Sequence, residues 1–141
     1  MTGPYIDHIG IIVENMDQSI ALFEQLFGVR PVSVKEMHDV GLRIAQFRAE
    51  NVDIELIQYT TKGEGFAREV MGSKPGINHI AILANDVETS AVNFEDKGAK
   101  LMQGFPRRGS HGKVAFFEPE STQGILLEIC EHAQRNWRRS P

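Results

Sequence analysis

The stretch that decides the fold is Asn78-His79-Ile80-Ala81-Ile82-Leu83, a short apolar run with a histidine near its start. An earlier stretch, Asp7-His8-Ile9-Gly10-Ile11-Ile12-Val13, has the same layout. In both, a small residue stands two positions after the histidine, and an acidic turn and an amphipathic segment follow. Because an internal repeat indicates two halves that fold alike, these stretches predict a duplicated architecture.

Helix and strand signals repeat in the same order in each half. The amphipathic segments 18–27 and 88–97 end at Gly28 and Gly98, which is typical of helix C-caps, and Asp17 is the predicted N-cap of the first helix. Each half therefore reads β-α-β-β-β, an α+β pattern. The predicted strands are 5–13, 30–38, 42–49, 52–58, 77–84, 99–104, 113–118 and 124–131, with a helix at 87–97, a glycine-containing loop at 106–112 and a turn at 119–123.

The 141 residues are interpreted as a single domain, 1–141, built from two modules. The first module covers 5–59 and the second covers 77–131. A polar, glycine-containing linker at 60–76 includes a possible short helix over 66–71, and residues 132–141 form a tail.

Each half also ends in an apolar strand that contains a glutamate. His8 and Glu55 are 47 positions apart, and His79 and Glu128 are 49 positions apart. A lone strand histidine is more often a hydrogen-bonded structural residue, and a lone strand glutamate more often faces solvent. The matched spacing of all four favours a pseudosymmetric metal site instead.

Strand geometry explains why these residue types suit a metal. Alternate side chains share a face, so Gly10 lies beside His8 and Ala81 beside His79, which leaves space next to each ring. A glutamate among apolar neighbours needs a partner, because an unpaired buried carboxylate is costly. Two imidazoles and two carboxylates suit Zn²⁺, Co²⁺, Ni²⁺, Mn²⁺ or Fe²⁺.

Composition excludes few function classes. The chain is 41% hydrophobic and 24% charged with a formal net charge of −4, which disfavours nucleic-acid partners. The basic cluster of Arg135, Arg138 and Arg139 is interpreted as a frayed terminus. The single cysteine, Cys130, excludes an intrachain disulfide, suits the cytoplasm and is expected to be buried. No signal peptide or membrane-length apolar run is visible.

Three further histidines lack the repeat symmetry. His38 and His132 are expected at the surface, whereas His111 lies in the glycine-containing loop and is left open.

Three pieces of sequence resemble the vicinal oxygen chelate superfamily, which includes glyoxalases, extradiol dioxygenases, resistance proteins and methylmalonyl-CoA epimerases. They are Asp7-His8-Ile9-Gly10, Ile77-Asn78-His79-Ile80-Ala81 and, most specifically, Gly109-Ser110-His111-Gly112-Lys113-Val114-Ala115-Phe116-Phe117 with Pro119, Gly124, Leu126, Leu127 and Glu128. The resemblance covers about 5–131 and is closest to the epimerases. It implies a cupped mixed sheet around a divalent metal, and a homodimer. The chain departs from the epimerases at Glu118-Pro119, where they usually have His-Pro, and on the third strand, where Ile44 and Gln46 stand in place of a glutamate that some carry.

This resemblance implies metal-assisted removal of the α-proton of an acyl-CoA thioester such as methylmalonyl-CoA. The metal ligands would be His8, Glu55, His79 and Glu128. Glu128 is the first candidate for proton transfer and Glu55 a weaker one. Substrate binding would fall to Gly109, Ser110, His111, Gly112 and Lys113, although Lys113 also fits a plain surface lysine.

Three alternatives stay open. The first is a glyoxalase-like lyase or isomerase that acts on a thiol hemithioacetal. The second is an Fe²⁺ dioxygenase, against which Glu55 argues, because such sites normally have one carboxylate. The third is a non-catalytic binding protein of the resistance type, which would often lack the ligands.

Overall fold

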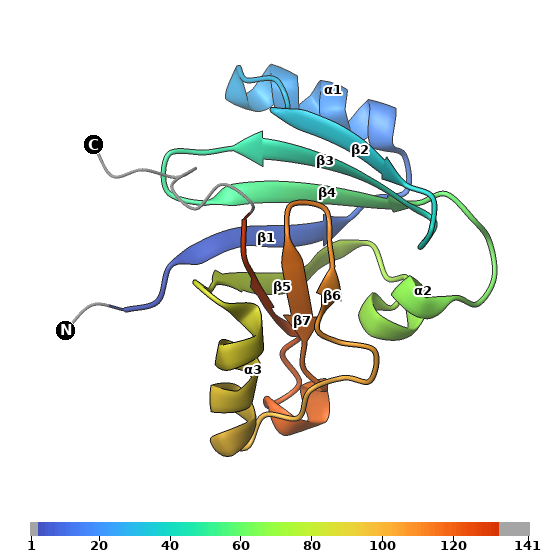
Figure 1. Ribbon diagram of the computed structural model, residues 1–141. Coiled ribbons are helices and arrows are strands. Elements are labelled where there is room, and N and C mark those ends of the chain that lie inside the picture. Colours follow the sequence, from blue (N-terminus) through green and yellow to red (C-terminus); the bar gives the residue numbers. More distant parts are fainter. Residues whose placement is uncertain (1–2, 133–141) are drawn as a thin grey trace. The chain divides into compact units, whose positions relative to one another are not determined.

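A computed structural model describes residues 3–132, which form two compact units (Figure 1). The 8–80 unit consists of His8–Ile80. The 81–132 unit consists of the described residues from Ala81 onwards together with those up to Asp7.

The strands follow the predicted repeat and form a mixed sheet in the order β2-β3-β4-β1-β5-β8-β7-β6. Pairing is parallel between β1 and β4 and antiparallel for β2–β3, β3–β4, β6–β7 and β7–β8, which confirms the α+β class. The strands are β1 (Ile6–Ile12), β2 (Ser33–Met37), β3 (Leu42–Arg48), β4 (Asp53–Tyr59), β5 (Gly76–Leu83), β6 (Arg107–Arg108), β7 (Lys113–Phe116) and β8 (Leu127–Cys130). The helices are α1 (Met16–Phe27), α2 (Phe66–Met71), α3 (Val87–Asp96) and the 3-10 turn η1 (Pro119–Ser121).

In the 8–80 unit, two helices cover different parts of the strands. Figure 1 shows α1 along one side of β2, β3 and β4, where Met16 packs with Ala45, Phe47 and Leu56. The opposite face of the strands packs against Ala67 of α2. Alternation along β3 produces both faces, with Ala45 and Phe47 on one and Leu42 and Ile44 on the other. The helix predicted at 66–71 is confirmed as α2.

The first helix begins earlier than expected, and the prediction of Asp17 as its N-cap is wrong. Asn15 is the N-cap, because its side-chain oxygen accepts from the N–H of Gln18 at 3.0 Å and its own backbone is extended. Asp17 lies in the first turn, where the helix dipole favours a carboxylate. Gly28 is confirmed as the C-cap, with φ of 71°.

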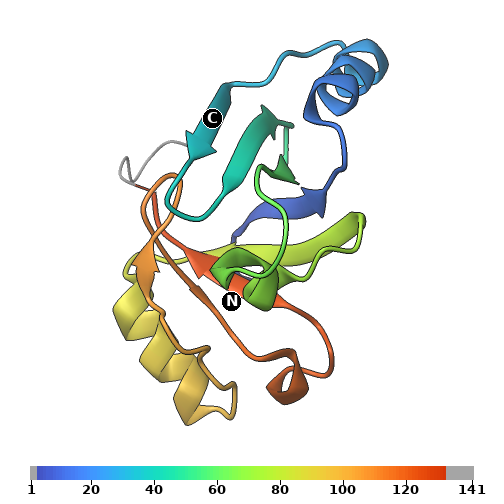
Figure 2. The same ribbon diagram turned by 90° about the vertical axis from the view of Figure 1, so that its right-hand side faces the viewer.

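In the 81–132 unit, α3 covers β7 and β8 (Figure 2). Val87 and Ala91 of the helix pack with Ala115, Phe117 and Ile129. The C-cap of α3 is Lys97, one residue before the predicted Gly98.

The strand predicted at 99–104 does not form. Only an isolated bridge joins Leu101 to Phe117. The chain then turns at Gly104, where φ is 93°. Part of the predicted loop 106–112 instead forms the two-residue strand β6.

No helix within residues 3–132 has the length and apolar character needed to cross a membrane. The basic cluster of Arg135, Arg138 and Arg139 lies outside the described residues.

Candidate metal centre

Three of the four predicted ligands come together inside the 8–80 unit. His8 on β1, Glu55 on β4 and His79 on β5 are only 4%, 6% and 3% exposed. The Nε2 of His8 lies 3.6 Å from Oε1 of Glu55. The two imidazole rings meet edge to face at 5.7 Å between centroids, and each offers a nitrogen within 4.8 Å of the other. Two imidazoles and a carboxylate in one buried group fit a divalent transition metal.

Strand register explains how these side chains reach one another. In the parallel β1–β4 pair, Gly10 stands opposite Glu55. A Cβ built on Gly10 would lie only 2.2 Å from Cε1 of His79. The space predicted beside His8 is therefore filled by the ring of His79, and only glycine at position 10 leaves room for it.

β4 carries a second buried carboxylate, that of Asp53. Asp53 is fully buried and accepts a hydrogen bond from Nε2 of Gln46 at 2.6 Å, and its Oδ1 is 4.0 Å from Nε of Arg48. Asp53 lies two residues before Glu55 on the same strand, so the sequence indicated that the two side chains share a face. The sequence did not show that Gln46 of β3 would donate a hydrogen bond to Asp53.

The third strand offers no carboxylate on the face that carries Glu55. Gln46 pairs with Glu55 across the β3–β4 ladder, and Ile44 lies two residues earlier on the same face. Both are buried and neither titrates.

Glu128 belongs to the 81–132 unit. It lies on β8 opposite Phe116 of β7 and is 5% exposed, so it is not a surface residue. This burial is compatible with the predicted ligand role of Glu128, which stays a prediction.

The predicted substrate loop is a tight turn between β6 and β7. The N–H of Gly109 donates to the carbonyl oxygen of Gly112 at 2.7 Å. A Cβ at Gly109 would come within 2.7 Å of Cγ1 of Val114, so a larger residue there would have to displace that side chain. Lys113 is half exposed and pairs with Glu88 of α3 at 3.1 Å. The substrate-binding role of 109–113 stays a prediction.

The expectation that His132 is a surface residue is wrong. Its side chain is 8% exposed, and its Nε2 lies 2.8 Å from Oδ1 of the buried Asp7. His111 stacks on it with ring centroids 5.4 Å apart. Asp7 was missed, although a carboxylate inside an apolar strand was a signal. His38 is at the surface, as predicted.

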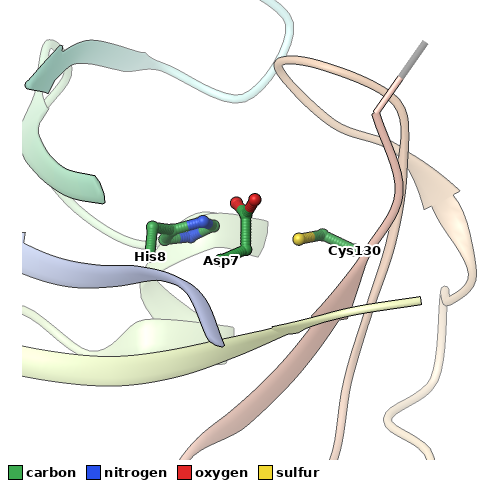
Figure 3. Close-up of side chains that lie close together, drawn as sticks. All are labelled: Asp7, His8 and Cys130. Carbon is green, nitrogen blue, oxygen red and sulfur yellow. The ribbon is translucent and has the colours of Figure 1, made fainter. Parts of the chain in front are cut away.

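Cys130 is buried, as expected, and lies near the same carboxylate. Figure 3 shows its Sγ directed toward Asp7, and the two side chains offer atoms within 4.8 Å of each other. His8, also drawn, is the next residue of β1.

Comparisons with known proteins cover most of the chain. A family model described as the Glyoxalase/Bleomycin resistance protein/Dioxygenase superfamily matches residues 7–117. The uncharacterized protein YqjC of Bacillus subtilis (strain 168) is 31% identical over 127 residues, covering 89% of this chain and 91% of that protein. The mitochondrial methylmalonyl-CoA epimerase of Dictyostelium discoideum is 26% identical over 130 residues, covering 89% and 77%. A solved methylmalonyl-CoA epimerase variant from Streptomyces coelicolor, in complex with 2-nitronate-propionyl-CoA, has a TM-score of 0.78 at 26% identity and covers 94% of this chain and 100% of that chain.

Proposed function

The chain belongs to the glyoxalase/bleomycin resistance/dioxygenase superfamily, and from this premise we propose that it is a divalent-metal-dependent epimerase. It would interconvert stereoisomers of methylmalonyl-CoA, or of a related 2-substituted acyl-CoA, by removing and returning the α-proton. The observation that carries the proposal is the buried group of His8, Glu55 and His79. The methylmalonyl-CoA epimerases among its relatives support the substrate class.

In this proposal Glu128 is the fourth ligand. Its burial and its matched spacing from His79 support the assignment. Zn²⁺, Co²⁺, Ni²⁺ or Mn²⁺ suits such a donor set. When bound, the cation supplies Lewis-acid stabilisation of the negative charge that develops on the thioester oxygen.

Proton transfer is assigned to the glutamates. Epimerisation needs a proton removed from one side of the α-carbon and returned to the other, and a general base typically contributes about 10²–10⁴-fold. Because Ile44 and Gln46 of β3 do not titrate, Glu128 is the first candidate and Glu55 the second. The turn at 109–112 and the amine of Lys113 would hold the polar parts of the substrate through N–H groups and charge.

The test is exchange of the α-proton with solvent. Protein loaded with Co²⁺ or Zn²⁺ would be mixed with methylmalonyl-CoA in D₂O, and loss of the α-proton signal followed by NMR. Rapid exchange that disappears in metal-stripped protein and in His79→Ala would support the proposal. Absence of exchange above the stripped control would remove the substrate assignment, and activity on a glutathione hemithioacetal would then favour the glyoxalase-type alternative.

We also infer a cytoplasmic homodimer. A single buried cysteine supports the reducing compartment. Exposed apolar side chains on α1, namely Leu22, Leu26 and Phe27, support self-association. Sedimentation equilibrium would report a single species of twice the chain mass.

A further inference from the structure

The side-chain amide of Asn78 joins α2 to His79 within the 8–80 unit. Its Nδ2 donates to the backbone oxygen of Met71, the last residue of α2, at 2.7 Å. Its Oδ1 lies 2.8 Å from Nδ1 of His79, the next residue on β5. Asn78 therefore contacts a helix end on one side and a predicted ligand on the other.

These two contacts determine which nitrogen of His79 carries the proton. The carbonyl of Met71 can only accept, so the NH₂ group of Asn78 must face it. The oxygen of Asn78 then faces His79, and because that oxygen can only accept, the Nδ1 of His79 must donate. A neutral imidazole has one N–H, so the lone pair lies on Nε2.

Gly10 lies against the same ring. A Cβ built on Gly10 would lie 2.2 Å from Cε1, 2.5 Å from Nε2 and 2.7 Å from Nδ1 of His79. The edge of the ring that carries both nitrogens thus lies directly against the backbone of β1. With Nδ1 bonded to Asn78, the nitrogen available to a cation is Nε2.

We propose that Asn78 is a positioning residue that holds His79 in the Nδ1-protonated tautomer and presents Nε2 as the ligand atom, with the carbonyl of Met71 fixing the orientation of the amide. The choice of ligand atom rests on the proposed metal site. The tautomer is a property of the protein alone and can be measured without a metal or a substrate.

The expected loss of metal affinity on removal of Asn78 can be estimated from other metal sites. A histidine ligand usually donates its second ring N–H to a fixed acceptor, and loss of that acceptor typically costs about 10–100-fold in metal affinity. Asn78 is half-buried, so its removal leaves no large cavity and the effect should fall on the ring rather than on the core.

The experiment is a long-range ¹H–¹⁵N correlation of the histidine rings in metal-free protein, at about pH 8, well above the usual histidine pKa of about 6.5. The His79→Ala spectrum assigns the signals. Wild type should show Nδ1 protonated and Nε2 unprotonated. Asn78→Ala should lose this pure state and bind Zn²⁺ about 10–100-fold more weakly by calorimetry. Asn78→Asp should keep the tautomer, because a carboxylate also accepts from Nδ1. Asn93→Ala, at an exposed position on α3, is the matched control and should change neither measurement.

Two results would overturn the proposal. One is a wild-type His79 protonated at Nε2, and the other is an unchanged tautomer in folded Asn78→Ala. If Asn78→Ala does not fold, loss of the tautomer in Asn78→Asp overturns it instead. The expected tautomer in wild type, together with no Zn²⁺ binding, would leave the positioning role standing and contradict the proposed function.

Discussion

The two copies of the repeat give their histidines different neighbours. In the second copy the preceding residue, Asn78, contacts the ring of His79 directly. In the first copy the preceding residue, Asp7, pairs with His132 from the far end of the chain. The small residue two positions after each histidine also differs, being Gly10 in the first copy and Ala81 in the second. Gly10 lies against the ring of His79. The two copies share residue types at matched spacing, whereas the contacts around each predicted ligand differ.

The largest expected difference between the copies concerns their glutamates. Glu128→Gln should slow α-proton exchange by about 10²–10⁴-fold, because the amide can still bind a metal but cannot act as a base. Glu55→Gln should slow exchange much less. Exchange rates from NMR in metal-loaded protein measure both, and equal losses would contradict the assignment of Glu128 as the principal base.

The next largest difference is expected in the unfolding free energies of variants at the two small residues, Gly10 and Ala81. Gly10→Ala places a Cβ against the ring of His79 and should cost about 1–3 kcal/mol of unfolding free energy, as overpacking does. Ala81→Gly at the matching, fully buried position should cost only about 0.5–1 kcal/mol. Urea denaturation compares them. A Gly10→Ala variant as stable as wild type would show that the ring moves without cost.

Substitution of the residue before each histidine should separate effects on stability from effects on the His79 tautomer. Asp7→Ala leaves His132 without its carboxylate partner in a buried setting and should cost about 1–3 kcal/mol. It should not alter the His79 tautomer, which Asn78→Ala is expected to alter. His132→Ala should cost a similar amount, and the double variant should lose less than the sum, because the two residues share one interaction. Strict additivity in urea denaturation would argue against the pair.

The smallest effect concerns the support of α2, whose last carbonyl orients Asn78. The hydroxyl of Tyr59 donates toward the carbonyls of Ala67 and Gly72, and Arg68 stacks over its ring at 4.1 Å. Tyr59→Phe should cost about 0.5–1.5 kcal/mol.

Tyr59 also predicts a pH dependence. Burial raises the pKa of Tyr59, and the charge of Arg68 lowers it to a lesser extent. A raised pKa in the folded state means that the stabilisation is complete below the unfolded pKa of about 10 and is lost as pH rises toward the folded pKa. The unfolding free energy should therefore fall more steeply above about pH 10 in wild type than in Tyr59→Phe. Parallel curves for the two proteins would show that Tyr59 does not contribute to the pH dependence of stability.

Period and repetition made most of the fold predictable. Apolar composition and the repeat placed β1, β3, β4 and β5 within a few residues. The repeat also predicted His8, Glu55, His79 and Glu128 as one set, of which the first three lie together in the 8–80 unit. Local turn chemistry was harder to read. Asn15 and Asp17 are both good N-caps, and only the backbone conformation decides between them. The segment 99–104 was predicted as a strand, but it forms only an isolated bridge at Leu101 and turns at Gly104.

Side-chain partners distant in sequence could not be predicted. His132 looked like a surface residue because its partner, Asp7, is at the other end of the chain. The hydrogen bond of Gln46 to Asp53 and that of Asn78 to Met71 depend on strand register and on the position of α2. Periodicity indicates which face a side chain occupies but not which neighbour it meets there.

The most direct test of the central claim is calorimetric titration of metal-free protein with Zn²⁺ or Co²⁺. Wild type should bind one ion per chain, and both His79→Ala and Glu128→Ala should lose that binding, because both residues are proposed as ligands of the same ion. Retention of one tightly bound ion in either variant would contradict the account.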